Sequence, residues 1–242
     1  MSESKNSLRI AVDIGGTFTD MACFDESTGA ISFGKALSTH GELVSGIQNT
    51  LDSAGIDLSN GYLFLHGSTI AINTLLERNG AKTALLITEG FRDIYEIGRV
   101  NRPDAYNLFF SKHEPLVPRS LRYEVSERLR ADGSLHKPLD EQAVRELARE
   151  LKAKHIEAVA VLLLHSYRNP DHERRVKAIL QEEIPGAFVT ASHELSQEYR
   201  EFERVSTAVA NSYVGPRVSE YLGELEHHLS DKGFEGDFYA VQ

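Results

Sequence analysis

The stretch Asp13-Ile14-Gly15-Gly16-Thr17-Phe18-Thr19-Asp20 decides how the chain begins to fold. An apolar run at 8–12 precedes it and a second one at 21–24 follows it, which predicts two strands joined by a tight turn. Gly15 and Gly16 are able to take positive φ and to let a ligand approach the backbone. Successive N–H groups in such a turn form a concave site for anions, and Thr17 and Thr19 add hydroxyl donors. The stretch therefore predicts a phosphate-binding hairpin, with Asp13 placed to hold a hydrated Mg²⁺.

This glycine motif differs from the two common nucleotide-binding motifs, because a strand and not a helix follows it. Two glycines alone would favour an ordinary β-turn with polar decoration, in which Asp13 only caps the turn. The two hydroxyls and the carboxylate at the strand end favour phosphate binding instead.

The composition sets limits on the classes of partner. The 242 residues suffice for one large domain or two modest ones, and the net charge of -10 argues against nucleic-acid binding. The lone Cys23 excludes an intramolecular disulfide and a multi-cysteine metal site. The longest apolar run, 158–164, is too short to span a bilayer, so we expect a soluble, cytoplasmic protein that does not bind membranes.

The rest of the chain alternates strand and helix patterns. Strands are expected at 8–14, 19–25, 30–36, 62–65, 82–88, 158–164 and 188–191, and helices at 42–54, 70–80, 140–154, 170–185 and 199–229. Residues 90–118 are irregular, a hairpin is expected over 122–136, and Gly215-Pro216 should kink or split the last helix. The final residues, 237–242, look like the start of another strand, from which we expect that the sequence is a piece of a longer protein.

Further candidate residues lie at the ends of these elements. His66-Gly67-Ser68-Thr69 stands between a strand and a helix, where free N–H groups favour anions, although the sequence alone favours a helix cap by Ser68 or Thr69. Arg99 and Arg102 in the irregular segment suit a carboxylate or phosphate clamp, with surface ion pairs as the alternative. His165 directly follows the apolar run 158–164 and is expected at the sheet's carboxyl edge, as a ligand contact or as a structural histidine.

Two other predictions concern residues with no assigned chemistry. His172, in the first turn of a helix, is expected to be exposed to solvent. Glu203 and Arg204, on the long last helix, are expected to form an intrahelical or inter-lobe ion pair rather than to act in catalysis.

Seven sequence motifs along the chain together resemble those of the A-type subunits of the hydantoinase/oxoprolinase family. The resemblance extends from about Arg9 to Gln242. That family includes N-methylhydantoinase, 5-oxoprolinase and subunits of acetone and acetophenone carboxylases. The motifs, each given with its first residue, are DIGGTFTD at Asp13, HGST at His66, LLERNGA at Leu75, TEGFRDIYEIGR at Thr88, RPDAYNL at Arg102, HSYRNPDHE at His165 and REFERVSTAVANSYVGP at Arg200. The chain departs from the usual pattern at Ser68, Ile72 and His193, which bears on the substrate pocket.

The resemblance implies an α/β fold, namely the first ribonuclease-H-like lobe of the actin/Hsp70/acetate-kinase superfamily. Such a lobe has a mixed sheet with flanking helices, and the chain would end before the second lobe. Residues 8–185 would form the N-terminal region of the family, with an irregular insertion at 90–138. Residues 186–242 would begin its central region.

The resemblance also implies ATP-dependent activation of a carbonyl by phosphorylation, followed by hydrolytic opening of a cyclic amide. Asp13 and Thr17 would be catalytic, Asp13 would hold Mg²⁺, and ATP would contact Gly15, Gly16, Thr17 and Thr19. Substrate contacts would come from Gly67, Ser68, Thr69, Arg99, Arg102 and His165. A B-type subunit and an oligomer are the expected partners.

Three other functions remain open from the sequence. The first alternative is a ketone carboxylase subunit, and the second is a small-molecule kinase of the same superfamily. The third is that the isolated fragment is a non-catalytic binding or assembly module. We expect the fragment itself to be inactive and to bind ATP weakly or not at all.

Overall fold

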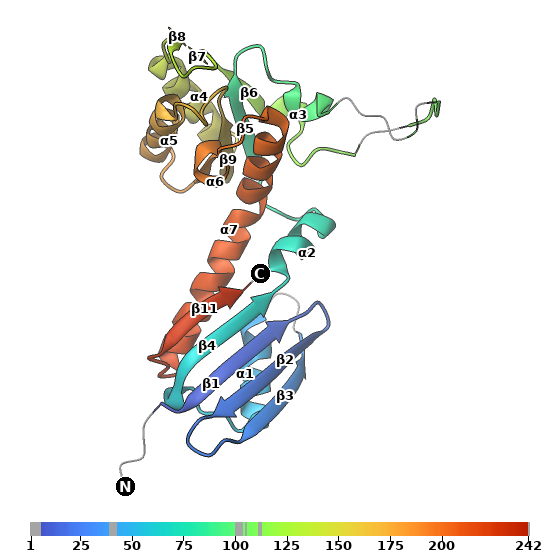
Figure 1. Ribbon diagram of the computed structural model, residues 1–242, viewed down its shortest axis with the longest axis vertical. Coiled ribbons are helices and arrows are strands. Elements are labelled where there is room, and N and C mark those ends of the chain that lie inside the picture. The colour runs from blue at the N-terminus through green and yellow to red at the C-terminus, as the bar shows by residue number, and fades with distance from the viewer. Residues whose placement is uncertain (1–5, 39–42, 100–103, 105, 111–112, 242) are drawn as a thin grey trace. The chain divides into compact units, whose positions relative to one another are not determined.

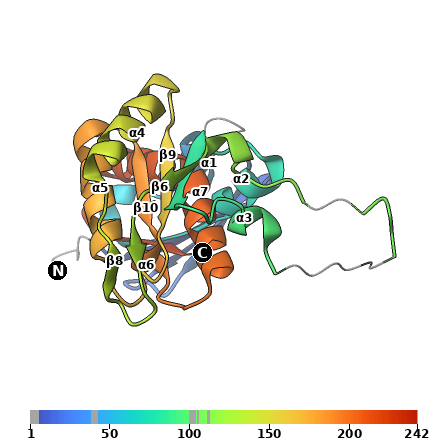
Figure 2. The same ribbon diagram turned by 90° about the horizontal axis from the view of Figure 1, so that it is seen from above.

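A computed structural model describes residues 6–38, 43–99, 104, 106–110 and 113–241. The chain forms two compact units, Met1–Glu77 with Arg217–Gln242, and Arg78–Pro216. Each unit has its own sheet, as Figure 1 shows, and Figure 2 gives the same ribbon turned by 90°. The predicted division of the chain at residues 185 and 186 stays a prediction about family regions.

The first unit contains a five-stranded mixed sheet in the order β11-β4-β1-β2-β3. Strands β1 (Leu8–Ile14), β2 (Phe18–Asp25) and β3 (Ile31–Leu37) form the predicted antiparallel meander. Strands β4 (Gly61–Ser68) and β11 (Asp237–Val241) continue the sheet in parallel to β1. The expected mixed sheet is therefore present, and residues 237–241 are a paired strand of it.

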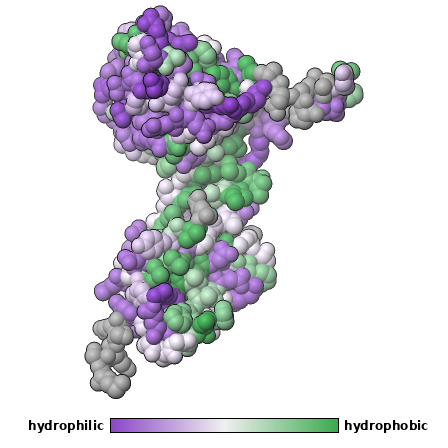
Figure 3. Space-filling view, viewed as in Figure 1, coloured by the Kyte–Doolittle hydropathy of each residue, from purple (hydrophilic) through white to green (hydrophobic). Residues whose placement is uncertain are grey.

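Among the described residues of this unit, helices cover one face of the sheet. Helix α1 (Leu43–Ala54) and the final turns of α7 (Glu201–Asp231) pack there. Their apolar side chains enclose alternate residues of the strands; the buried set includes Ile10, Val12, Ile14, Met21, Cys23, Ile47, Leu51, Phe64, Tyr221 and Leu225. Helix α2 (Ile70–Glu77) and a short 3₁₀ helix (Leu58–Asn60) complete the unit. The opposite face carries exposed apolar side chains, among them Phe33, 76 % exposed, and Figure 3 shows hydrophobic surface over these strands.

The second unit is built around a four-stranded parallel sheet in the order β10-β9-β5-β6. Its strands are β5 (Thr83–Thr88), β6 (Arg122–Val125), β9 (Ala158–Leu162) and β10 (Phe188–Ala191). Every residue of β5 and of β9 is buried, as expected for interior strands of a parallel sheet. The predicted buried strand at 158–164 is thus confirmed, with its end at Leu162.

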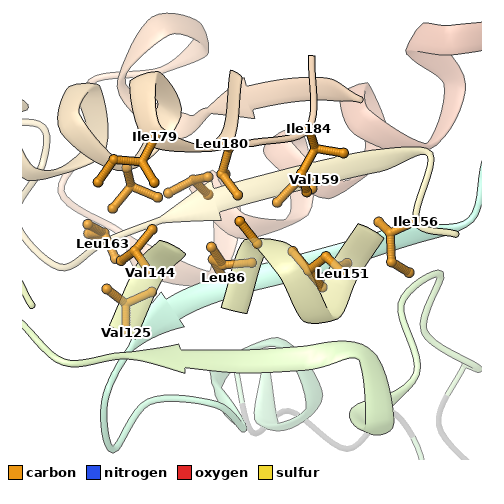
Figure 4. Packing of buried hydrophobic residues seen from close by; sticks show 14 residues of the cluster. Leu86, Val125, Val144, Leu151, Ile156, Val159, Leu163, Ile179, Leu180 and Ile184 are labelled. Carbon is orange, nitrogen blue, oxygen red and sulfur yellow. The ribbon is translucent and has the colours of Figure 1, made fainter. Parts of the chain in front are cut away.

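Helices cover both faces of this parallel sheet. On one face, α4 (Glu141–Ala153) and α5 (Asp171–Glu183) pack their apolar sides onto β5 and β9, with the side chains drawn in Figure 4. On the other, Val205, Ala208 and Val209 of α7 pack against Leu85 and Leu162. Short helices α3 (Ile94–Ile97) and α6 (Ser192–Leu195), a 3₁₀ turn (Arg119–Leu121) and a small hairpin of β7 (Arg128–Leu129) and β8 (Leu135–Lys137) complete the unit. The predicted cap of α4 is confirmed, because the Asp140 side chain accepts a hydrogen bond from the Ala143 N–H.

Two predicted elements were wrong in part. The expected hairpin over 122–136 is shorter, because its first strand, β6, leaves to join the parallel sheet beside β5. Helix α7 is also neither split nor broken at Gly215-Pro216 but runs on through Pro216. A Cβ at Gly215 would lie 2.4 Å from the Phe188 ring, so this glycine permits close packing instead of ending the helix.

The expected pair between Glu203 and Arg204 is also wrong, because Arg204 turns inward to a buried polar cluster. The fully buried Glu173 carboxylate accepts hydrogen bonds from the Leu163 N–H at 2.8 Å, the Ser192 hydroxyl at 2.7 Å and the His193 N–H at 2.9 Å. Arg204 donates to the Leu163 carbonyl and to Ser192, and its guanidinium lies 3.8 Å from Glu173. Burial alone would raise the pKa of Glu173, but the bonds from His193, Leu163 and Ser192 outweigh it and hold this pKa below its ordinary value.

Within the described part of the chain, no helix combines the length and the apolar character needed to cross a membrane.

Candidate functional site

The glycine turn between β1 and β2 is held by a few backbone bonds and by one serine. The Gly15 N–H donates to the Phe18 carbonyl at 3.0 Å, which closes the turn. Ser38, just after β3, donates its N–H to the Thr17 carbonyl and its hydroxyl to the Gly15 carbonyl, both at 2.9 Å. These bonds occupy carbonyl oxygens, so the turn directs its acceptors inward.

The N–H groups at the tip of this turn stay available. Among the described residues, none accepts a hydrogen bond from the N–H of Gly16 or Thr17, and both residues are exposed. A Cβ placed on Gly16 would meet nothing within 4 Å, so a ligand has room to approach the backbone there. Neither Gly15 nor Gly16 has positive φ, so the expected left-handed backbone is not what shapes the turn.

The two threonines of the hairpin lie in different surroundings. Thr17 is exposed at the tip. Thr19 is fully buried on the helix-covered face, where its Oγ1 lies 3.2 Å from the Ser38 Oγ. The hydroxyl of Thr19 therefore supports the turn from behind and does not share a face with Asp13. Its predicted phosphate contact stays a prediction.

Asp13 lies at the end of β1 on the open face of the sheet, directly beside Gly67 of β4. A Cβ on Gly67 would lie only 2.7 Å from Asp13 Oδ1, so the carboxylate lies close against the Gly67 backbone. A glycine at position 67 leaves the room that this carboxylate occupies. The two sequence motifs, 53 residues apart, thus meet at one point of the sheet.

A second carboxylate faces the same side. Asp20 of β2 is the cross-strand partner of Asp13, and two like charges opposite one another repel. Lys35 of β3 bonds to Asp20 at 2.9 Å, while Asp13 has no ion-pair partner among the described residues. An unpaired carboxylate beside a second one is a donor set that suits Mg²⁺, which binds through one or two carboxylates and retains waters. The residues present fit the predicted metal.

These carboxylates line a hollow of about 650 Å³ on the open face of the sheet. Its walls are otherwise mostly apolar; the lining residues are Ala11, Val12, Asp13, Asp20, Met21, Ala22, Phe33, Gly34, Lys35, Leu65 and Gly67. The hollow is open to solvent and combines an apolar wall with three charged side chains, a composition that suits contact with a small molecule.

The residues that follow Gly67 are set by the same strand pairing. Ile14 is the register partner of Ser68, and the Thr69 hydroxyl lies 3.4 Å from the Ile14 carbonyl. The Ser68 hydroxyl accepts from the Ile70 N–H at 3.3 Å, which supports the interpretation as a helix cap. The strand also runs further than predicted, so that Gly67 and Ser68 are strand residues. Gly67, Ser68 and Thr69 therefore surround the β1 end of the hairpin.

His66 of the same motif has a structural position. It is fully buried, and its Nε2 lies 2.7 Å from the hydroxyl of Tyr221. Burial lowers the pKa of His66 and raises that of Tyr221, so both are neutral at pH 7.

The other predicted site residues belong to the second unit or lie outside the described residues. Arg99 forms an ion pair with Glu203, which matches the alternative of a surface pair. Arg102 lies outside the described residues. His165 lies beyond the end of β9, at the carboxyl edge of the parallel sheet as expected. His172 is not exposed as predicted, because its Nδ1 lies 2.7 Å from the buried Glu127 carboxylate.

Comparison with known proteins gives a consistent result for the sequence. The family model of the hydantoinase/oxoprolinase N-terminal region matches residues 9–184. An uncharacterized protein of Methanocaldococcus jannaschii is 40% identical over 97% of this chain and 35% of its own length. The caprolactamase subunit alpha of Pseudomonas jessenii is 34% identical over 95% of this chain and 34% of its own length.

Solved structures agree with the sequence relatives. The crystal structure of the ATP-dependent caprolactamase from Pseudomonas jessenii matches 97% of this chain and 35% of that chain, with a TM-score of 0.86 and 33% identity. A nucleotide-free acetone carboxylase structure, from work on ATP-dependent acetone carboxylation, matches 97% of this chain and 36% of that chain, with a TM-score of 0.84 and 29% identity. The chain thus spans about a third of the length of these relatives.

Proposed function

The chain belongs to the hydantoinase/oxoprolinase family, and we propose from this membership that the whole protein uses ATP to activate the carbonyl of a cyclic amide for hydrolytic ring opening. An amide oxygen is a poor leaving group, and its phosphorylation makes it a good one. Phosphoryl transfer requires mainly positioning and neutralisation of charge. The observation that carries the proposal is the meeting of Asp13 and Gly67 beside free N–H groups.

Each residue of the hairpin then has a distinct task. The N–H groups of Gly16 and Thr17, together with the exposed Thr17 hydroxyl, donate to the terminal phosphate oxygens of ATP. Asp13 and Asp20 would hold a magnesium ion, which would supply neutralisation of the phosphate charge. Gly15 and Thr19 keep the turn in place through Ser38, and Gly67 keeps the Asp13 carboxylate in position.

The open hollow beside Asp13 is our proposed entrance for the reacting groups. Gly67 lines this hollow, and Gly67, Ser68 and Thr69, which follow one another at the end of β4, contact the substrate or the transferred phosphate. Arg99, Arg102 and His165 remain proposed substrate contacts. The support for Arg99 is weaker, because Arg99 already forms an ion pair with Glu203. The strand order β3-β2-β1-β4-β11 supports the further proposal that this unit is the first of two ribonuclease-H-like lobes.

Ketone carboxylation is the second candidate, because an acetone carboxylase structure matches nearly as well as the caprolactamase structure. In both reactions the phosphorylated oxygen is a carbonyl or enol oxygen, so the hairpin has the same task. Several relatives bear subunit names, which supports a second, B-type subunit and an oligomer as partners. A small-molecule kinase is the third candidate and differs in releasing a stable phosphorylated product.

The test is ATP turnover by the whole protein with its B-type partner. Phosphate release is measured with hydantoins, lactams, 5-oxoproline and simple ketones, with and without bicarbonate, beside an Asp13→Asn variant. Release that needs a cyclic amide and Asp13 is the expected result, and a bicarbonate requirement would move the protein to the carboxylases. A stable phosphorylated substrate would point to a kinase, and phosphate release that is indifferent to Asp13 would refute the proposed site. Micromolar ATP affinity of residues 1–242 alone would contradict the expectation that this chain binds ATP weakly.

A further inference from the structure

A second pocket lies in the unit Arg78–Pro216, at the carboxyl edge of its parallel sheet. Its volume is about 600 Å³, and its walls come from the segments that follow β5, β6 and β9 and from the small hairpin; the lining residues are Glu89, Gly90, Glu127, Arg128, Leu129, Arg130, Ala131, His136, Lys137 and His165. Ligands of parallel α/β sheets gather at this edge, outside the carboxyl ends of the strands. Of the residues given a task in the proposed ATP reaction, His165, a proposed substrate contact, lines this pocket, and the binding of ATP and magnesium requires none of its other residues.

The acidic residues of the pocket are already satisfied. Lys137 bonds to Glu89 at 2.7 Å, and its hydrogen bond and charge hold the pKa of Glu89 below its ordinary value. Glu127 is fully buried, with one oxygen accepting from the Thr88 hydroxyl and the other 2.7 Å from His172 Nδ1. Both carboxylates therefore act as fixed parts of the wall.

Two guanidinium groups of the pocket, those of Arg128 and Arg130, form no close ion pair with a described carboxylate. Arg128 is half-buried and lies 4.7 Å over the ring of Phe91, which restrains it without neutralising it. The side chain of Arg130 lies 3.1 Å from His136 Nδ1, and its charge adds to the hydrogen bonds from Ser134 that hold the pKa of Asp132 below its ordinary value. Neither arginine forms an ion pair within the described ranges, although the chain as a whole carries a net charge of -10. Arginines that form no close ion pair in a pocket favour a bound anion.

His165 provides an independent reason to expect a ligand here. Its φ of 62° places a residue other than glycine in the left-handed region, a conformation that is rare and gathers at functional sites. Its Nδ1 is buried and has no hydrogen-bond partner among the described residues. The backbone beside it is fixed, because the Leu164 N–H donates to Thr88 Oγ1 at 2.9 Å and Thr88 in turn donates to Glu127. The fold thus holds a histidine with a strained backbone in the wall of the pocket, with its Nδ1 out of reach of solvent.

We propose that this pocket binds a small oxyanion, the carboxylate or phosphate group of a metabolite, between the guanidinium groups of Arg128 and Arg130 and the ring of His165. The planar donors of arginine match both groups, and His165 lies beside them in the wall of the pocket. The inference goes beyond the proposed ATP reaction and rests on the unit Arg78–Pro216 alone. A small anion with these contacts should bind with a Kd on the order of 1 mM.

The experiment follows backbone amide signals of the ¹⁵N-labelled chain 1–242 while acetate or inorganic phosphate is added at constant ionic strength. One of the two anions should give saturable shifts at Glu127, Arg128 and His165. The Arg128→Gln/Arg130→Gln double variant should weaken this binding by at least about ten-fold. His165→Asn should weaken it by several-fold, since asparagine tolerates positive φ and keeps the backbone unchanged. Arg174→Gln is the matched control, because Arg174 is an exposed arginine on α5 outside the pocket.

The two arms separate the sources of the anion. Saturation by acetate assigns the pocket to carboxylates, and saturation by phosphate assigns it to phosphorylated compounds. Shifts that rise linearly with either salt would overturn the proposal. So would saturable binding that survives in the double variant or is equally weakened in Arg174→Gln.

Discussion

The substitution Gly67→Ala should displace the proposed catalytic carboxylate of Asp13 while it changes the stability of the first unit only slightly. The new Cβ would lie 2.7 Å from Asp13 Oδ1, so the oxygen must retreat by about 0.7 Å to an ordinary contact of 3.4 Å. The obstructing atom is the end of a side chain that rotates, and an off-rotamer χ angle costs about 0.5–1.5 kcal/mol. The chain should therefore stay folded, with a fall in Tm of no more than about 6 °C.

The effect on ATP turnover should be far larger. A displacement near 1 Å of a positioned group costs up to about 100-fold in rate. We expect the whole protein with Gly67→Ala to lose about 10- to 100-fold in substrate-stimulated phosphate release. Asp13→Asn sets the scale for complete loss of the carboxylate charge. Gly223→Ala is the matched glycine control, because its Cβ meets nothing within 4 Å.

Phosphate release and thermal melts together give the decisive comparison. If Gly67→Ala kept wild-type ATP turnover while Asp13→Asn lost it, the activity of Asp13 would not depend on the close approach that a glycine at position 67 allows. A collapse of Tm in Gly67→Ala would show that the glycine serves packing, and the argument from carboxylate placement would then be wrong.

Three further predictions concern the chain 1–242 in thermal and denaturant unfolding. Glu173→Gln should lower the free energy of unfolding by about 3 kcal/mol, because it leaves Arg204 buried without its counter-charge. The control Glu150→Gln removes an exposed pair with Lys154 and should lower it by less than about 1 kcal/mol. Equal losses in the two variants would refute the role of the buried cluster. Since the pKa of Glu173 is below its ordinary value of 4.5, its stabilising contribution is present above pH 4.5 and is lost as the pH falls through the folded-state value. The difference between wild type and Glu173→Gln should accordingly shrink below pH 4.5, and a difference that grows there would contradict this sign. Gly236→Ala should destabilise by more than about 3 kcal/mol, because its Cβ would lie 2.4 Å from the backbone of Tyr62, and a Tm near that of wild type would refute this packing.

Local patterns predicted the parts of the fold that depend on neighbours in sequence. The hairpin around Gly15-Gly16, the buried strand β9 and the Asp140 cap each follow from residues a few positions apart. The division into two sheets was not predicted, because strand length and polarity do not state which strand pairs with which. Strand β6 illustrates this, since its pattern fits a hairpin as well as a parallel edge.

The sequence predicted site residues only where one short motif contains both the reactive side chain and the turn or strand end that positions it. The sequence placed Asp13 and Gly67 in separate motifs, and only the parallel pairing of β1 with β4 brings them into contact. The partners of Glu127 and Glu173 could not be found, because His172 and Arg204 lie 45 and 31 residues away on other elements. A usable signal was Arg204 itself, a charge inside the apolar stripe of α7.

The position of Asp13 follows from the burial of its neighbours. Ile10, Val12 and Ile14 alternate with it along β1 and are each at most 3 % exposed, so they fix which face of the strand enters the core. A slip of one residue against β2 or β4 would turn Val12 and Ile14 to solvent and place the Asp13 carboxylate among apolar side chains, which costs several kcal/mol. The same pairing sets Asp13 beside Gly67 and opposite Asp20. The hydrophobic pattern that stabilises the sheet is therefore also what fixes the proposed site, and no separate device is needed to hold the carboxylate on the open face.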